Sequence, residues 1–116
     1  MSSAVASRGE IWIIDLDAGR GSEQRGSRPA LVVQNDVGNR YAATTIVAMI
    51  TSTTKLYPVT VGLRKGEGGL DRRSMVNLAQ VLTIDKSRLT TRIGSLSPKT
   101  MKRVDQAIRI SLDVQP

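Results

Sequence analysis

The chain has 116 residues and a formal net charge of +7, from 17 lysines and arginines against 10 aspartates and glutamates. This length predicts one domain with a real core, and the basic balance predicts an acidic partner, with nucleic acid favoured and an acidic protein as the alternative. The chain contains no cysteine and no histidine, which excludes thiol nucleophiles, disulfides, Cys/His zinc sites and a histidine acid–base pair.

Residues 1–7 are polar and rich in small side chains, without the apolar core of a secretory signal. We expect them to form a disordered extension to a single domain over residues 8–116. No run approaches the roughly 18 apolar residues that would span a membrane, so the sequence predicts a soluble, cytoplasmic protein without a membrane partner. With one Trp, two Tyr and no Phe, an aromatic platform for stacking bases is not expected.

The first half of the chain predicts three strands. Residues 10–16 are rich in β-branched side chains and end at the polar loop 17–29, which favours a buried strand. Residues 30–34 form the second strand, and residues 35–39 (NDVGN) carry the side chains typical of a turn. Residues 44–51 are almost continuously apolar, which predicts a central strand.

The second half predicts shorter strands separated by a basic loop. Residues 59–63 alternate as a half-exposed strand does, and residues 64–73, with three glycines, predict a flexible basic loop. Residues 74–82 form a further strand and residues 92–94 a short last one. Five or six short strands closed by one helix predict a mainly β fold with a small, barrel-like sheet.

The closing helix begins near Ser97, a suitable N-cap, with Pro98 at the first helical position. Five apolar residues fall on one face at helical spacing: Met101, Val104, Ala107, Ile108 and Leu112. We expect this face to pack on the sheet, with a partner-binding role as the alternative.

A polar, glycine-punctuated loop over residues 21–29 ends in Arg28 and Pro29 and runs into the strand at Ala30. Such a loop can deliver a guanidinium to the start of a rigid strand, which suits a group that binds phosphate. On composition alone, a solvated inter-strand loop is the favoured alternative.

The order of several motifs resembles the MazF/PemK family, the toxin endoribonucleases (mRNA interferases) of type II toxin–antitoxin systems. The resemblance extends from Arg8 to about Leu112, and its motifs are Gly-Ser-Glu-Gln, Arg-Pro, Val-Val-Gln-Asn-Asp-Val-Gly-Asn and a strand ending Met-Ile-Thr. It implies an SH3-like barrel of the CcdB/PemK type with short helices. It also implies a sequence-specific, metal-independent enzyme that cleaves single-stranded messenger RNA to 2′,3′-cyclic phosphate and 5′-hydroxyl ends, and so inhibits translation and growth.

The resemblance places the two catalytic residues of the family on Arg28 and Thr51. A fixed guanidinium can stabilise the charge that gathers on the phosphorane oxygens, and a threonine hydroxyl can donate to a non-bridging oxygen. Arginine keeps its proton, so Arg28 is poorly suited to act as the base. Glu23 is a conceivable base, although we favour a role in orienting Arg28 or reading a base edge, and the base stays unassigned.

Polar and basic side chains in the loops and at strand ends are the predicted RNA contacts: Ser22, Gln24, Arg25, Lys55, Arg73 and Gln80. Arg20, Lys65 and Arg72 are further loop cations that could follow the phosphate backbone. The family typically carries an acidic residue before the glutamine, whereas this chain has Ala79, so its base preference at one subsite is open.

The resemblance also implies a homodimer with RNA grooves beside the subunit interface, no cofactor or metal, and a MazE-like antitoxin with an acidic C-terminal tail. Two alternatives stay open. A CcdB-like toxin that binds DNA gyrase needs a tryptophan near its C-terminus, and the only tryptophan here is Trp12. A non-catalytic basic barrel that binds nucleic acid fits the charge but leaves Arg28 and Thr51 unexplained.

Overall fold

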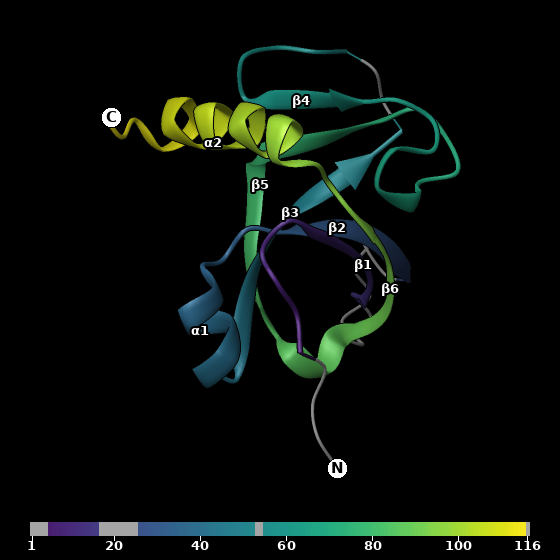
Figure 1. Cartoon of the computed structure of the whole chain (residues 1–116), viewed down its shortest axis with the longest axis vertical. Coiled ribbons are helices and arrows are strands. Elements are labelled where there is room, and N and C mark those ends of the chain that lie inside the picture. Colours follow the sequence, from purple (N-terminus) through teal and green to yellow (C-terminus); the bar gives the residue numbers. More distant parts are fainter. Residues whose placement is uncertain (1–4, 17–25, 53–54, 116) are drawn as a thin grey trace.

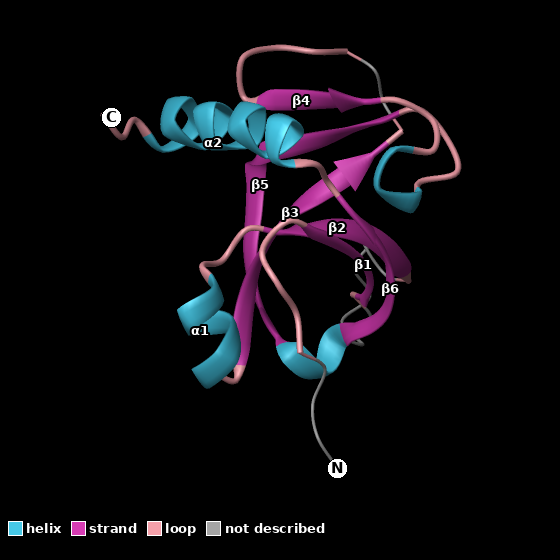
Figure 2. Cartoon of the chain, in the orientation of Figure 1, coloured by secondary structure: helices cyan, strands magenta, loops and turns pink. Residues whose placement is uncertain are grey.

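The computed structural model describes residues 5–16, 26–52 and 55–115 (Figure 1). Six strands of this part of the chain form one antiparallel sheet in the order β4-β5-β3-β2-β1-β6. The strands are β1 (Glu10–Asp15), β2 (Ser27–Val32), β3 (Thr44–Thr51), β4 (Thr60–Leu63), β5 (Ser74–Asp85) and β6 (Leu89–Ser95). The helices are α1 (Asp36–Tyr41) and α2 (Pro98–Leu112), with 3-10 turns at Glu67–Gly69 and Lys86–Arg88 (Figure 2). The predicted mainly β fold with a C-terminal helix is confirmed.

The central strands are buried on both faces, which explains the continuous apolar run in β3. Val47 and Met49 belong to one buried cluster, which contains Trp12, whereas Ala48 and Ile50 belong to a second cluster, which contains Val104. Alternate side chains of a strand point to opposite faces, so the two clusters lie on the two sides of the sheet. The sheet bends strongly around them (Figure 2), as the barrel-like prediction required.

Helix α2 covers one of these clusters by packing against β4 and β5 (Figure 1). The Ser97 side chain caps it by accepting the Thr100 N–H at 3.1 Å. Val104 and Ala107 are buried, and Met101 and Ile108 pack beside them, but Leu112 is 61% exposed. The predicted apolar face is therefore buried as far as Ile108 and not at Leu112, the last residue of the helix.

Two local predictions in the first half were wrong. Residues 35–39 do not form a simple turn: Asn35 caps α1, and its side chain accepts the Gly38 N–H at 2.8 Å. In turns and at helix N-caps alike, an asparagine side chain accepts a hydrogen bond from a nearby backbone N–H. The presence of Asn35 therefore did not distinguish a turn from the start of a helix. Strand β2 begins at Ser27 rather than Ala30, so Arg28 lies within the strand and not in the loop before it.

The basic loop over residues 64–73 is packed rather than open. A Cβ atom on Gly69 would lie 1.9 Å from the Ile93 carbonyl oxygen of β6, and one on Gly94 would lie 2.2 Å from the Gly68 carbonyl oxygen. Gly69 and Gly94 therefore allow the backbones of the loop and of β6 to come into contact. Composition alone does not distinguish this role of glycine from flexibility.

The predicted N-terminal extension falls partly on residues 1–4, which lie outside the described residues. Ala6 is 2% exposed and packs in the cluster around Trp12. The Ser7 N–H donates to the Glu10 carboxylate at 2.9 Å. None of the helices in the described part of the chain is long and apolar enough to cross a membrane.

Candidate active site

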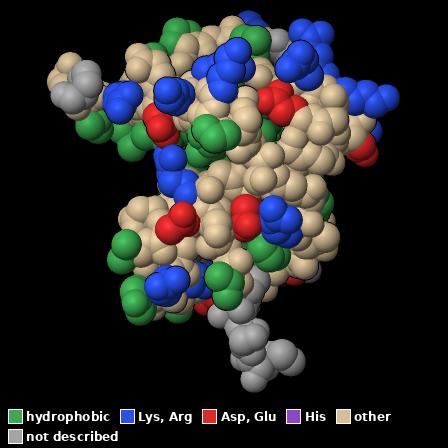
Figure 3. Space-filling view, viewed as in Figure 1, with side chains coloured by type: hydrophobic (Ala, Val, Ile, Leu, Met, Phe, Trp, Pro, Cys, Tyr) green, Lys and Arg blue, Asp and Glu red, His purple; other side chains and the backbone are tan. Residues whose placement is uncertain are grey.

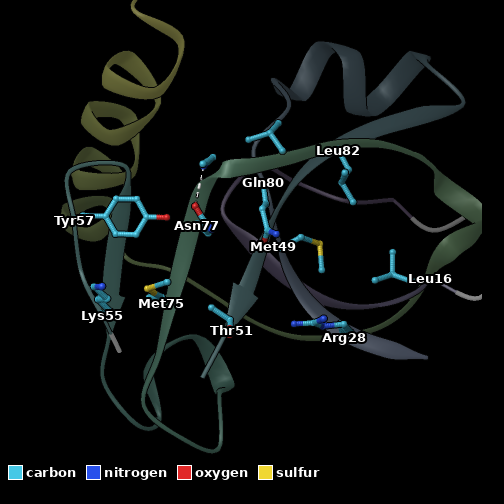
Figure 4. Close-up of a pocket in the computed structure, with 12 residues that line it drawn as sticks. Leu16, Arg28, Met49, Thr51, Lys55, Tyr57, Met75, Asn77, Gln80 and Leu82 are labelled. Atoms are coloured by element: carbon cyan, nitrogen blue, oxygen red, sulfur yellow. Dashed lines mark hydrogen bonds between the residues drawn. The ribbon is translucent and has the colours of Figure 1, made fainter. Parts of the chain in front are cut away.

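The two predicted catalytic residues lie at the adjacent ends of β2 and β3 and line the same hollow. Ala30 and Met49 form the last pair between these antiparallel strands, and Arg28 and Thr51 each lie two residues beyond that pair. Residues two apart on a strand share a face, which places both side chains on the same side as Met49. Figure 4 shows Arg28, Met49 and Thr51 at one hollow. The sheet therefore brings together two residues that are 23 positions apart in sequence.

Arg28 and Thr51 line a hollow of about 760 Å³, whose floor is largely apolar (Figure 4). Leu16, Met49, Met75 and Leu82 form that floor, whereas the polar groups are Arg28, Thr51, Lys55, Tyr57, Asn77 and Gln80. An apolar floor with a few convergent polar groups is the usual composition of a site that binds an organic ligand. Two cations and no carboxylate of the described residues line it, so the hollow favours an anion.

An irregularity in β5 presents Gln80 to this hollow. Ala48 of β3 pairs with Val81, but the next residue, Met49, pairs with Asn77, so residues 78–80 bulge out of the ladder. The Asn77 side-chain oxygen accepts the Ala79 N–H at 2.9 Å and closes the bulge (Figure 4). Bulges next to active sites commonly redirect a side chain, and here the exposed Gln80 lines the hollow.

Asn77 lines the hollow and was not among the residues predicted from the sequence. Its oxygen must face the Ala79 N–H, because an N–H needs an acceptor, so the amide group of Asn77 keeps its two donors on the other side. Asparagine is depleted in strand interiors, and an asparagine between Val76 and Leu78 was the available signal. Tyr57 also lines the hollow and was not predicted.

The remaining predicted residues have different outcomes. Lys55 and Gln80 line the hollow with Arg28. Arg73 lines a separate hollow beside Leu63, whereas Arg72 joins Arg28 and Thr51 at a smaller one of about 260 Å³. The predicted residues that lie outside the described part of the chain are Arg20, Ser22, Glu23, Gln24 and Arg25.

Carboxylates are sparse around Arg28. Asp71 lines the smaller hollow and lies 3.7 Å from Arg72, and both side chains are largely exposed. Among the described residues, no group of three or more Asp or Glu side chains gathers where it could hold a metal ion. The described residues of the hollow offer a guanidinium, an ammonium, the hydroxyls of Thr51 and Tyr57 and two amide side chains around an apolar floor.

Comparison with known proteins shows the family to which the chain belongs. The sequence profile of the family described as PemK-like, MazF-like toxin of type II toxin–antitoxin systems matches residues 7–112. Endoribonuclease EndoA of Bacillus subtilis is 44% identical over 110 residues, which cover 93% of this chain and 95% of that protein. Endoribonuclease MazF of Staphylococcus saprophyticus is 44% identical over 107 residues, covering 90% and 89%.

Solved structures agree in fold. A mycobacterial endoribonuclease in complex with its cognate antitoxin superposes with a TM-score of 0.82 at 25% identity, covering 96% of this chain and 98% of that one. The Mycobacterium tuberculosis toxin MazF-mt6 superposes with a TM-score of 0.80 at 25% identity, covering 92% and 99%. The chain belongs to the PemK-like, MazF-like family of toxins of type II toxin–antitoxin systems. Its curated relatives are endoribonucleases, which supports an RNA-cleaving enzyme and favours neither alternative.

Proposed function

We propose that this MazF-like endoribonuclease cleaves single-stranded messenger RNA by attack of a 2′-oxygen on the adjacent phosphate, without a metal ion. The products are a 2′,3′-cyclic phosphate and a 5′-hydroxyl, and the consequence is inhibited translation and growth. The observation that carries the proposal is that Arg28 and Thr51 line the same basic hollow. Arg28 stabilises the charge on the phosphorane oxygens, and the Thr51 hydroxyl donates to one of them.

The 2′-hydroxyl proton needs a separate acceptor, because arginine does not lose its proton in proteins. No carboxylate among the described residues lines the larger hollow. Glu23 therefore stays the proposed orienting or basic residue, and its position lies outside the described part of the chain.

Base recognition falls to the amide groups beside the apolar floor. Gln80 on its bulge and Asn77 offer donors and acceptors to base edges, while Lys55 contacts the phosphate backbone. Ser22, Gln24 and Arg25 of the preceding loop complete the proposed contacts. Ala79 supplies no carboxylate at this edge, so we expect a site preference different from that of relatives with an acidic residue there.

The toxin pairs with a MazE-like antitoxin whose acidic C-terminal tail occupies the RNA groove, and it acts in the cytoplasm as a homodimer. The mycobacterial neighbour in complex with its cognate antitoxin supports such a partner. A hollow that attracts phosphates attracts carboxylates for the same electrostatic reason. A specific dimer buries on the order of 800 Å² per subunit, so sedimentation at micromolar protein should give twice the chain's mass.

The decisive experiment is cleavage of labelled single-stranded RNA in excess EDTA, followed by analysis of the product ends. We expect cleavage at a short recurring motif, with cyclic phosphate on the upstream fragment. Dependence on magnesium or manganese would contradict the mechanism. Intact RNA that binds tightly would favour a non-catalytic barrel, and intact RNA with inhibited gyrase would favour the CcdB-like alternative.

A further inference from the structure

Three adjacent hollows extend from Arg28. Arg28 and Arg72 line the first, of about 260 Å³, which shares Ser74 with a second of about 170 Å³. Arg64 lines both the second hollow and a third of about 820 Å³, beside the start of α2. Because each hollow shares a wall residue with the next, the three lie next to one another on the surface, and together we call them the basic track.

Cations dominate the basic track along its whole length. Arg73 lines its second hollow, and Lys65, Lys99 and Arg103 join Arg64 in the third. Lys and Arg side chains gather over α2 and the loop after β4 in Figure 3. Seven cations (two in the first hollow, two in the second and three more in the third) face two carboxylates, Glu67 and Asp71.

The acidic group in the third hollow is already used within the fold. One Glu67 carboxylate oxygen accepts the Arg64 N–H at 3.0 Å, and the other accepts the Thr100 hydroxyl at 2.8 Å. Within the described residues, no carboxylate lies at ion-pairing distance from the side chain of Arg64, Lys65, Lys99 or Arg103. Exposed cations at this density repel one another, and an anionic polymer would relieve that repulsion.

We propose that the basic track holds the phosphate backbone of the RNA that flanks the cleavage site, an inference that rests on the proposed function. The track begins at Arg28 itself, so a strand with its scissile phosphate at Arg28 can continue into it. The third hollow is lined by glycine and by polar and charged side chains. Among the described residues that line it, none has an aromatic side chain on which a base could stack and none has an aliphatic side chain, so it contacts backbone and carries no sequence preference.

A matched pair of double variants tests the track. Lys99→Ala with Arg103→Ala removes two cations from the third hollow, and Lys102→Ala with Arg109→Ala removes two exposed cations from the same helix outside it. Each pair of substitutions changes the net charge from +7 to +5, so the long-range electrostatic attraction for RNA falls equally in the two double variants. Fluorescence anisotropy then measures binding of single-stranded RNAs of increasing length over a salt series, and cleavage is measured separately.

We expect the variant in the hollow to bind long RNA roughly tenfold more weakly, with a salt slope smaller by about 1.4, since each phosphate contact contributes about 0.7. Binding of the shortest cleavable RNA should be unchanged, and the control pair should resemble the unmodified chain.

Equal losses of RNA affinity for both double variants, or a loss that does not depend on RNA length, would overturn the track. Unchanged RNA binding with lost binding of a glutamate-rich peptide would assign the third hollow to a protein partner instead. If the unmodified chain binds longer RNA more tightly but never cleaves it, the result would contradict the proposed function and not the track.

Discussion

Arg28 on β2 and Thr51 on β3 line the same hollow, each two residues beyond the pairing of Ala30 with Met49, the last pair between the two strands. Thr51 also pairs with Met75 on β5, so the sheet fixes the hydroxyl-bearing residue. Groups fixed by a sheet need little reorganisation when charge develops on a bound phosphate, which is the condition for strong transition-state stabilisation.

Arg28→Ala should lower the cleavage rate by about two to three orders of magnitude, the scale for losing one transition-state donor. RNA affinity should fall much less, because other cations share the backbone. Single-turnover cleavage, with circular dichroism to verify folding, measures the effect. Arg28→Lys is the control for charge: it should recover only part of the rate, because an ammonium lacks the bidentate geometry. A folded Arg28→Ala protein with unmodified activity would remove the central assignment.

Thr51→Val removes the hydroxyl at constant volume and should lower the rate by about tenfold to a hundredfold. Thr51→Ser keeps the hydroxyl and should retain most of the activity, although the strand loses a β-branched residue. Comparing the cleavage rates of the two variants by single-turnover kinetics separates the contribution of the hydroxyl from that of side-chain packing. If both variants lose activity equally, Thr51 acts through the sheet and not through its oxygen.

Asn77→Ala should lower kcat/KM by about tenfold, because the Ala79 N–H loses its acceptor and the bulge that presents Gln80 loosens. In a Gln80→Ala background the same change should have little further effect, since the group that it positions is already absent. Asn77→Ser, which keeps an acceptor, should restore part of the activity. Additive losses in the double variant would show that Asn77 acts independently of Gln80.

Gly69→Ala should lower the free energy of unfolding by about 3 kcal/mol or more, from a clash with the Ile93 carbonyl oxygen and a positive φ of 84°. Gly66→Ala is the matched control: its φ is also positive, at 91°, but nothing lies within 4 Å of the added Cβ. It should therefore cost only about 1 to 2 kcal/mol. Urea unfolding measures both, and equal losses would contradict the close approach of the two backbones.

Asp36 should make the fold less stable in acid. The Arg8 backbone N–H donates to its carboxylate at 2.7 Å, the Asn39 amide donates at 3.0 Å, and these bonds hold the pKa of Asp36 below its ordinary 3.8. A lowered folded pKa means that the stabilisation is present above the unfolded value and disappears as pH falls through the folded one. Asp36→Asn should therefore be less stable at pH 7, by at most about 1 kcal/mol because the group is exposed, and the difference should vanish near pH 2. A difference that persists unchanged at pH 2 would contradict this account.

The sequence was sufficient to predict the features that depend on local patterns. The β-branched runs predicted the first strands, the almost continuously apolar run at residues 44–51 predicted a central strand, and Ser97 with Pro98 predicted the start of α2. Arg28 and Thr51 could be chosen because the motifs around them are ordered as in the family. Residue propensity and hydrophobic periodicity are local properties, so they can be recognised in the sequence before the fold is known.

Only the tertiary structure decided how distant segments meet. The bulge at residues 78–80 arises from the pairing of β5 with β3, and no local pattern predicted that Asn77 would close it. The glycines of residues 64–73 suggested flexibility, but Gly69 serves to bring its backbone against Ile93 of β6. The basic track likewise joins cations from that segment and from α2. Strand register and helix packing determine which charges share a surface, and the preferences of single residues do not.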